Sequence, residues 1–321
     1  MGPRVREPEA HWPQLVLSQW QDTLATLHRW VQIVGKTRLA LAPAENHFWQ
    51  VVQYVSARGL TTSPMPAGSR TLEVEFDFVD HRLEARTSEG ASRALPLQPM
   101  SVAEFYRRYR EMLKALEIDV RIYPVPSEMA GATPFPADRD HASYDSDAAQ
   151  RCWRILVQVD RVLKRFRGAF IGKCSPVHFW WGGFDLACTR FSGRRAPEHP
   201  GGVPGLPDRV TREAYSHECI SAGFWPGSPE APIEGPIFYS YIYPEPPGCR
   251  EAQVRPFPAE YHPVLREWTL PYEVVRTASD PDAKLLEFLQ STYEAAADLG
   301  KWNRADLDRP QGGVISDLAD R

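Results

Sequence analysis

Apolar residues recur at helical spacing in four segments of the chain. The first segment, 13–34, carries them at three- and four-residue steps, at Leu17, Trp20, Leu24, Leu27 and Val31. This spacing predicts an amphipathic helix that ends at Gly35. The same periodicity predicts helices over 101–117, 146–167 and 282–300. Ser101 and Glu104 form a capping-box pattern at the start of the second helix.

Other segments alternate apolar and polar side chains, the pattern of a half-buried β-strand. In 71–87 the residues Leu72, Val74 and Phe76 share one face, while Glu73 and Glu75 share the other. Further strands are predicted over 37–43, 48–55, 119–124, 172–191, 237–243 and 265–275. Together the two patterns predict an α+β fold with antiparallel sheets.

The order of several landmarks indicates an internal duplication. A Gly-Lys pair precedes a His-Phe-Trp triplet at 35–49 and again at 172–180. A Leu-Pro pair precedes a Glu-Phe pair at 95–105 and again at 270–288. The step from the lysine to the histidine differs, 11 residues against 5, so the repeats are divergent. We expect two divergent helix–antiparallel strands–helix repeats joined into one pseudo-symmetric body.

These repeats set the expected domain organisation. The boundaries are 1–13 for a flexible arm, 14–125 for the first repeat, 126–145 for a connector, 146–303 for the second repeat and 304–321 for a flexible tail. The second repeat contains a Pro/Gly-rich insertion, 191–236, and the stretch 191–260 holds 13 of the 30 prolines. Long irregular segments of this kind often form lids or binding loops.

The composition of the 321 residues narrows the class of protein. The 37 basic and 41 acidic side chains give a formal net charge of −4, which argues against a dedicated nucleic-acid binder. No uncharged run approaches the roughly 18 residues that a membrane span needs, and the first ten residues lack an apolar signal core. Five cysteines without a Cys-x-x-Cys pair fit reduced thiols. We therefore expect a cytoplasmic monomer or homodimer that binds neither nucleic acid nor membranes.

Two histidines and two neighbouring acids are the first candidates for chemistry. His178 and Asp185 flank a Gly-Gly pair, where the backbone can bulge or approach a ligand closely. His217 and Glu218 follow on another segment. All four are candidate catalytic groups, and His178, His217 and Asp185 are candidate ligands of a divalent metal ion. The alternative is structural, because no HExxH or HxH spacing supports a metal site.

Nearby residues are candidates for substrate binding. Arg190 and Arg194 could hold a carboxylate or phosphate in a bidentate manner, or could belong to a solvated rim. Three tyrosines share one face of the strand predicted over 237–243, so we expect Tyr243 and Trp225 to wall a pocket. Glu245 follows on a proline-stiffened turn. The tyrosines could equally pack the sheet.

The first half and the connector add two further groups. His47, Asp77 and His81 are either a degenerate copy of the second-half site or a second site. His141 and Asp145 are either an acid–base pair or part of a turn-rich linker. The chain has no G-x-G-x-x-G, Walker or G-x-S-x-G motif, so no nucleotide cofactor is expected.

Longer motifs connect the chain to a family. SPVHFWWG, TRFSGR, SHECISAGFWPG, YIYPEP, LPYEVVR and STYEAAA resemble an uncharacterised bacterial family, a domain of unknown function. The resemblance extends from about Trp12 to Arg304 and implies a bacterial, soluble, single-module protein. It supplies no activity, fold or catalytic residue.

Three functional hypotheses follow. The leading one is an enzyme, in one version assisted by a divalent metal, acting on a small polar or anionic metabolite in a cleft between the repeats. The second is a non-catalytic module that binds a small ligand through its aromatic residues. The third is an interaction scaffold that docks a partner on the insertion 191–236.

Overall fold

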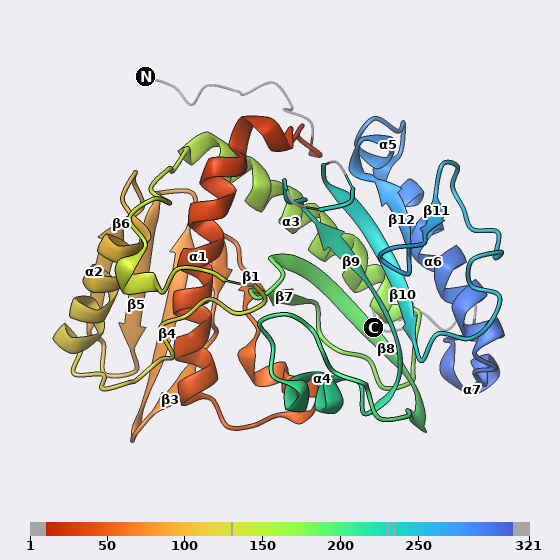
Figure 1. Cartoon of the computed structure of the whole chain (residues 1–321), viewed down its shortest axis with the longest axis horizontal. Helices are drawn as coiled ribbons and strands as arrows, with labels where there is room; N and C mark the ends of the chain where they lie inside the picture. Colours follow the sequence, from red (N-terminus) through yellow and green to blue (C-terminus); the bar gives the residue numbers. More distant parts are fainter. Residues whose placement is uncertain (1–10, 130, 230, 234, 311–321) are drawn as a thin grey trace, which may run out of the picture.

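Two antiparallel sheets, each of six strands, meet around a shared hydrophobic core in the computed structural model of the chain (Figure 1). The model describes residues 11–129, 131–229, 231–233 and 235–310. The first sheet has the order β1-β2-β4-β5-β6, with β3 paired to β4. Its strands are β1 (Tyr54–Val55), β2 (Gly59–Thr61), β3 (Met65–Ala67), β4 (Arg70–Asp77), β5 (Arg82–Thr87) and β6 (Ser92–Pro96).

The second sheet has the order β11-β12-β10-β9-β8-β7 and lies at the right in Figure 1. Its strands are β7 (His178–Trp180), β8 (Asp185–Arg195), β9 (His217–Trp225), β10 (Ile237–Tyr243), β11 (Glu260–His262) and β12 (Glu267–Pro271). A bridge between Gln53 and Phe179 connects the β1 side of the first sheet to β7. The prediction of an α+β fold with antiparallel sheets is therefore confirmed.

Helices cover and join the sheets. They are α1 (Leu17–Leu41), α2 (Val102–Ala115), α3 (Ser146–Gly168), α4 (Asp208–Ala214), α5 (Tyr272–Arg276), α6 (Pro281–Leu299) and α7 (Arg304–Leu307), with the 3-10 helices η1 (Asn46–Val51) and η2 (Phe135–Ala137). Helix α1 runs between the two sheets in the view of Figure 1. Trp30, which stacks on Phe105 of α2, is wholly buried there.

The predicted end of the first helix at Gly35 is wrong. Helix α1 continues through Gly35 to Leu41, so the strand predicted over 37–43 is also wrong. Gly35 lies against the indole of Trp181, and an added Cβ would overlap that ring. The glycine therefore permits close packing between α1 and the second half of the chain, and it does not terminate the helix.

Most of the other predicted elements agree with the structure. The predictions over 101–117, 146–167 and 282–300 correspond to α2, α3 and α6, and the one over 237–243 coincides with β10. Ser101 caps α2, since its hydroxyl accepts a hydrogen bond from the Glu104 amide at 3.2 Å. The segment 119–124 forms no strand, and 265–275 divides at Pro271 into β12 and α5.

The internal duplication is not confirmed. The first Gly-Lys pair lies inside α1, whereas Gly172 and Lys173 precede β7 outside any helix. The first His-Phe-Trp triplet belongs to η1, where His47 and Phe48 have positive φ angles of 60° and 61°, and the second forms β7. The Leu-Pro pairs do have matching positions, at the ends of β6 and β12, and both Glu-Phe pairs lie in helices, α2 and α6.

Both ends of the described chain pack on the body. Trp12, within the predicted arm, is 3% exposed and contacts Phe238 and Tyr272. In the predicted tail, Asp308 accepts a hydrogen bond from the hydroxyl of Tyr293 at 2.5 Å. The rest of the predicted arm and tail, 1–10 and 311–321, lies outside the described residues. Within the described part, no helix has the length and apolar character needed to cross a bilayer.

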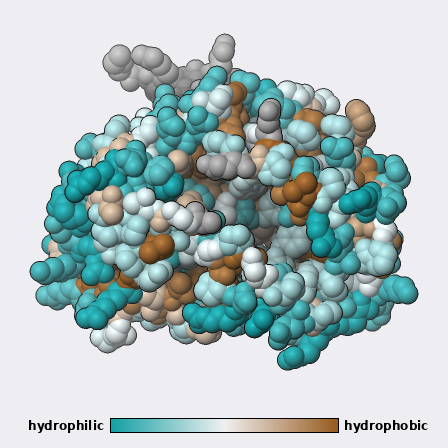
Figure 2. Space-filling view, viewed as in Figure 1, coloured by the Kyte–Doolittle hydropathy of each residue, from teal (hydrophilic) through white to brown (hydrophobic). Residues whose placement is uncertain are grey.

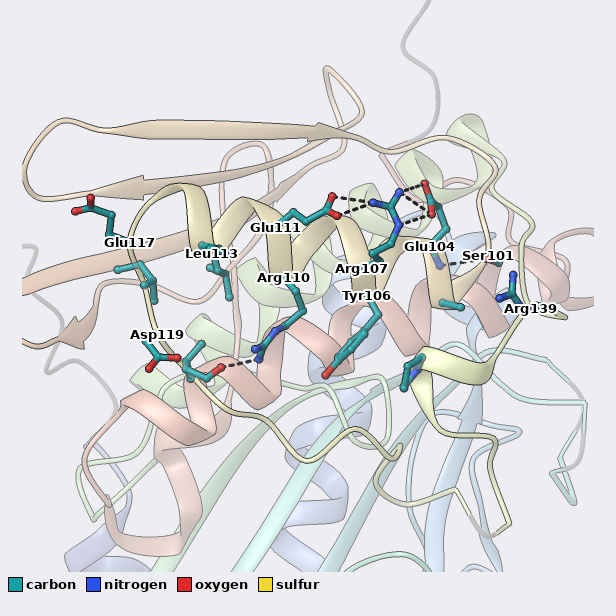
Figure 3. Close-up of a pocket in the computed structure, with 15 residues that line it drawn as sticks. Ser101, Glu104, Tyr106, Arg107, Arg110, Glu111, Leu113, Glu117, Asp119 and Arg139 are labelled. Carbon is teal, nitrogen blue, oxygen red and sulfur yellow. Dashed lines mark hydrogen bonds and ion pairs between the residues drawn. The ribbon is translucent and has the colours of Figure 1, made fainter.

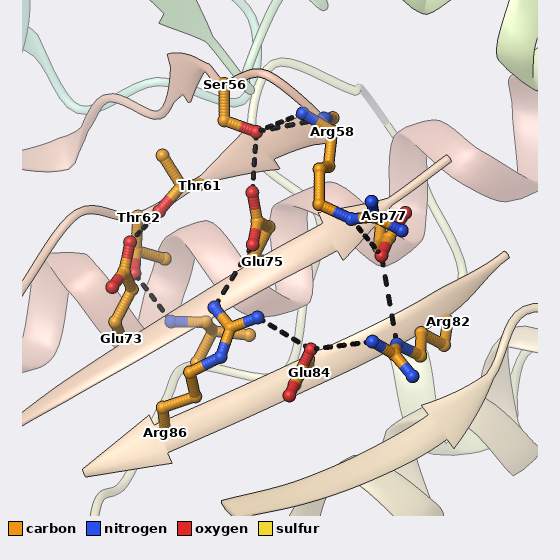
Figure 4. A network of polar contacts seen from close by, with 12 residues as sticks. Ser56, Arg58, Thr61, Thr62, Glu73, Glu75, Asp77, Arg82, Glu84 and Arg86 are labelled. Atoms are coloured by element: carbon orange, nitrogen blue, oxygen red, sulfur yellow. Dashed lines mark hydrogen bonds and ion pairs between the residues drawn. The ribbon is translucent and has the colours of Figure 1, made fainter. Parts of the chain in front are cut away.

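The outward face of the first sheet carries a network of paired charges (Figure 4). Asp77 accepts a hydrogen bond from Arg58 Nε at 2.7 Å and lies 3.8 Å from Arg82 Nε. Glu75 accepts from Ser56 Oγ at 2.6 Å and from Arg86 at 3.1 Å. Asp77 and Glu75 of the alternating pattern in 71–87 are thus paired with arginines, whereas Glu73 accepts a hydrogen bond from the Thr61 hydroxyl at 2.7 Å.

Candidate functional site

A cavity of about 520 Å³ lies where α1, η1, the second sheet and the insertion 191–236 meet. Hydrophobic patches surround a hollow near the middle of the face seen in Figure 2. Alternate residues of the strands form one wall of the cavity: Asp185, Ala187 and Thr189 of β8, Cys219 and Ser221 of β9, and Tyr239 and Tyr241 of β10. The period of two in a strand puts these side chains on one face of the sheet.

A glycine on β9 allows side chains of β8 and β10 to make contact across it. The Tyr239 hydroxyl donates a hydrogen bond to Asp185 Oδ2, although β9 lies between their strands. The ring crosses β9 at Gly223, where an added Cβ would lie 2.8 Å from the tyrosine hydroxyl and would overlap the Leu186 carbonyl oxygen. Glycine at this position therefore makes the Tyr239–Asp185 contact possible.

The turn between β7 and β8 brings two acids together. An added Cβ on Gly182 would overlap the carboxylate of Glu128, and one on Gly183 would lie 2.7 Å from Asp185 Oδ1. The two carboxyl groups therefore pack on consecutive glycines of one turn. Glu128 itself has a positive φ of 58°, and its amide donates to the Gly205 carbonyl of the insertion at 3.1 Å.

Burial and the neighbouring acids change the protonation of these groups. Removal from water, and secondarily the charge of Glu128, raise the pKa of Asp185 to about 7, against the effect of the Tyr239 hydrogen bond. Desolvation of its carboxylate also raises the pKa of Glu128, although the residue as a whole is exposed, and Lys36 opposes that shift. On β12, burial and the charge of Asp185 raise the pKa of Glu267 to about 8.

Helix α1 holds the turn and the Glu128 segment in place. His28 Nε2 donates to the carbonyls of Trp181 and Gly182 at 3.0 and 2.8 Å, and burial lowers its pKa to about 4. One turn later, Gln32 exchanges two hydrogen bonds with the backbone of Ser127, at 2.9 and 2.7 Å. These contacts fix both acids relative to the helix.

The third polar residue of this helix face is a lysine. The ammonium of Lys36 donates to Ser127 Oγ at 2.8 Å and lies 5.6 Å from the ring of Trp181. Its side chain is 5% exposed, and burial lowers its pKa to about 8 against the opposing charge of Glu128. Lys36 and Glu128 are thus an acid–base pair at one end of the cavity.

Aromatic side chains make up much of the remaining lining. Trp49, Trp180, Trp181, Tyr215, Tyr239 and Tyr241 all contribute. Trp180 is the register partner of Asp185, so its side chain stands next to the acid on the same face. The hydroxyls of Tyr215 and Tyr241 are hydrogen-bonded at 2.8 Å. Gly205–Pro207 and α4 of the insertion close another side of the cavity.

Asp185 is the predicted catalytic residue that lines this cavity. Trp225 lies next to the turn between β7 and β8, since its indole donates to the Gly183 carbonyl at 3.1 Å.

His178 is buried in contact with the rings of Trp49, Tyr54 and Trp180 and is 1% exposed. Neither of its ring nitrogens has a hydrogen-bond partner within the described chain. Burial lowers the pKa of His178 to about 3, so its ring is neutral.

His178 and His217 do not form a shared metal site. The rings of Trp49 and His47 lie between them in a series of contacts at 5.5, 5.5 and 5.6 Å. Among the described residues, no three His, Cys, Asp or Glu side chains are grouped so that they could hold a metal ion. Glu218 binds Arg194 instead, with distances of 2.8 and 2.7 Å to Nε and Nη2.

The two arginines predicted to bind an anion have structural contacts. Arg190 is 1% exposed, and its guanidinium packs 3.5 Å from the ring centre of Phe166 and 4.3 Å from that of Tyr293. Arg194 donates to the carbonyls of Gly300 and Lys301, at the end of α6. Neither side chain lines the cavity, so their predicted role finds no support in the geometry.

The remaining predicted residues lie around or away from the cavity. Tyr243 donates to the Pro197 carbonyl at 3.0 Å. Glu245 accepts hydrogen bonds from Tyr261 and Arg266, both at 2.6 Å.

The three first-half candidates do not form a second site. His47 lines the cavity, whereas Asp77 and His81 belong to the first sheet, at the end of β4 and in the turn that follows it. His141 hydrogen-bonds Asp138 at 2.9 Å, and the carboxylate of Asp145 caps α3.

Lys36, Glu128 and Tyr215 are the cavity residues that sequence analysis missed. A signal for Lys36 does exist, because His28, Gln32 and Lys36 follow at four-residue steps and therefore share one face of α1 with buried apolar residues close by. Such a buried polar stripe indicates a polar neighbour. Nothing in the connector distinguishes Glu128 from its other acids.

A second, larger groove runs along α2 (Figure 3). Its best-defined polar contacts involve two arginines: Arg107 lies 2.7 Å from both Glu104 and Glu111, and Arg110 donates to the Val120 carbonyl at 2.6 Å. The ion pairs of Arg107 are exposed contacts along one helix, with ordinary surface chemistry. The central cavity is therefore the candidate functional site.

Comparison with known proteins identifies the family. Residues 12–309 match the model of a family of unknown function, DUF5996, so the chain belongs to that family. Neither the curated proteins nor the solved structures gave a significant match. The suspected resemblance is confirmed, and the function of the family is not assigned.

Proposed function

We propose that this protein binds a small organic molecule in the central cavity and that Asp185 is the polar group that orients it. The observation that carries the proposal is the position of Asp185, a half-buried carboxyl group that lies beside Trp180 and is hydrogen-bonded to Tyr239 in the wall of a cavity of about 520 Å³. Volume, aromatic lining and a few convergent polar groups are the usual properties of small-molecule sites.

Two further features support a built binding site. Glu128 and Asp185 occupy the space left by Gly182 and Gly183, and Tyr239 crosses β9 at Gly223. Hydrogen bonds from α1 hold the turn between β7 and β8 and the neighbouring Ser127. The insertion 191–236 contributes Gly205 and α4 to the lining, which agrees with a role in enclosing a ligand. The arginines of the anion hypothesis are outside the cavity, so we do not propose an anionic metabolite.

The test is a ligand-detected NMR screen of fragments and metabolites with a cavity-filling variant. Ala187→Met places three extra heavy atoms in the lining, and Ala115→Met adds the same bulk on the exposed face of α2. We expect compounds that bind the wild type and Ala115→Met and that lose binding to Ala187→Met. If no compound binds, or if the two variants bind alike, the proposal is wrong.

Proton transfer is a second candidate function, favoured by the protonation of Asp185. A carboxyl group with a pKa of about 7 can both donate and accept a proton near neutral pH, which suits a general acid–base catalyst. Incubation of the bound compounds in D2O, followed by NMR, would show exchange at carbon or conversion to product. We expect Asp185→Asn to abolish either change while the compound still binds; equal rates in the variant would exclude this role.

A further inference from the structure

We infer that the ligand of the cavity is an organic cation, an amine or a quaternary ammonium group on an apolar body, with Asp185 as its counter-ion. This inference rests on the proposed function, because it requires that the cavity takes a ligand. It goes further in assigning the charge of that ligand, and it reverses the anionic substrate expected from the sequence. Three sets of contacts carry it.

The first is the absence of a basic partner for Asp185. Among residues in the described part of the chain, no lysine, arginine or histidine forms an ion pair with Asp185 or Glu267. The hydrogen bond that Asp185 Oδ2 receives comes from the neutral hydroxyl of Tyr239. The charged groups that influence it are the acids Glu128 and Glu267. A half-buried carboxylate among other acids lacks compensation for its charge, and a bound cation supplies it.

The second is the aromatic surface next to this acid. Trp180 is its cross-strand neighbour on β7, and the ring of Tyr239 crosses Gly223 to reach it. Trp225 lies on the other neighbouring strand and is anchored to the Gly183 carbonyl. Trp180, Trp225 and Tyr241 pack against the small apolar cluster of Ala187, Ile237 and Tyr239. The faces of such rings attract ammonium groups, most strongly where water is excluded.

The third is the position of the protein's own cations. Lys36 is at the α1 side of the cavity, where it donates to Ser127 and is balanced by Glu128. Arg209 lines the cavity from α4 but is exposed, and Arg190 is enclosed by rings of the core. An anionic ligand near Asp185 would therefore face uncompensated carboxyl groups, whereas a cationic ligand would complete an ion pair.

The experiment compares matched triplets of compounds that share one body and differ in charge. Phenylethyl, indolylethyl and cyclohexylethyl bodies each carry an ammonium, a hydroxyl or a carboxymethyl group, and affinities are measured by calorimetry at pH 8. We expect the ammonium members to bind about tenfold or more tightly than the hydroxyl members, since a hydrogen-bonded charge contributes that much. Asp185→Asn should remove this preference, and Glu111→Gln on α2 should leave it intact.

The outcomes of this experiment distinguish a failure of the cation inference from a failure of the proposed function. If the hydroxyl or carboxymethyl members bind as well as the ammonium members, the cation inference is wrong and the proposed function stands. If no member of any triplet binds, both are overturned. Should Asp185→Asn fail to fold, calorimetry of the wild type at pH 6.5 in buffers of different ionisation enthalpy replaces it. Ammonium binding must then release protons, and binding without release would contradict the inference.

Discussion

Acidic side chains gather at two places in this protein, and their surroundings differ in one respect. On the first sheet, Asp77 is 1% exposed and accepts hydrogen bonds from Arg58 and from the amides of Val79 and Asp80. In the cavity, Asp185 is half-buried and receives its side-chain hydrogen bond from a tyrosine. Within the described part of the chain, Asp77 is paired with cations and Asp185 is not.

The pKa of each acid reports this difference. Burial pushes the pKa of Asp77 upward, but the hydrogen bonds from Arg58 and the two amides outweigh it, and the net shift is downward. Burial also pushes the pKa of Asp185 upward, and the single tyrosine hydrogen bond does not offset it. The first arrangement stabilises the fold, and the second reduces its stability at pH values where Asp185 is ionised.

Replacing Asp185 should give the largest effect and should stabilise the protein. Its pKa of about 7 in the folded chain exceeds the value of about 4 in the unfolded chain, so folding favours the protonated form. The resulting penalty is absent below pH 4, grows as the pH rises to 7, and is complete above that. Asp185→Asn should therefore raise the free energy of unfolding at pH 8 by up to about 4 kcal/mol, since each pKa unit corresponds to about 1.4 kcal/mol.

Urea unfolding at pH 5 and pH 8 checks this prediction. The gain should shrink markedly at pH 5, where the wild-type acid is already mostly protonated. A variant that is less stable than the wild type at pH 8 would contradict the view that Asp185 lacks compensation. Glu128, Glu267 and Tyr239 face the same acid, so their ionisation must be followed together with it.

Replacing Asp77 should have the opposite sign. Asp77→Asn removes a carboxylate that Arg58 and Arg82 share, and we expect a loss of about 3 kcal/mol in the free energy of unfolding. Because the folded-state pKa of Asp77 is lowered, this stabilisation is complete above about pH 4 and is lost only as the pH falls through the folded value. The loss should therefore be equal at pH 5 and pH 8 in the same unfolding experiments, and a strong change across that interval would contradict it.

Gly223→Ala should lower the free energy of unfolding by a smaller amount and should also change the cavity wall. The added methyl group would overlap the Leu186 carbonyl oxygen and crowd the Tyr239 hydroxyl, so we expect a loss of about 2 kcal/mol and displacement of the ring from Asp185. Gly168→Ala in α3 is the control, because an added Cβ there meets nothing within 4 Å. Thermal unfolding measures the first effect. If both variants have the same melting temperature, β9 does not depend on its glycine.

Local patterns predicted much of the secondary structure but little of how it packs. Helix α2 and strand β10 follow from capping and alternation, which involve residues close in the chain. The helix end predicted at Gly35 is wrong, because a glycine that ends a helix and a glycine that makes room for a tryptophan cannot be told apart in the sequence. The second role depends on Trp181, which is 146 residues away in sequence and comes near only when the two halves meet.

Some residues of the candidate site were predicted from the sequence, and others were not. Asp185 and the tyrosines of β10 were identified because glycines and aromatic residues mark that stretch. The pairing of His178 with His217 does not occur, because its geometry depends on the register of β8 and on a bulge between Phe191 and Arg195 that no local pattern specifies. Lys36 and Glu128 meet only through tertiary structure.

The glycines of the cavity also affect how a family of this kind can diversify. Aromatic residues of the lining can be exchanged one at a time for other apolar residues, so the shape of the ligand can change gradually. At Gly182, Gly183 and Gly223, even one methyl group would occupy the place of an acid or of its tyrosine partner. Relatives should therefore keep or lose the acidic end of the cavity as a unit, and those that keep it can differ widely in the size of the cavity.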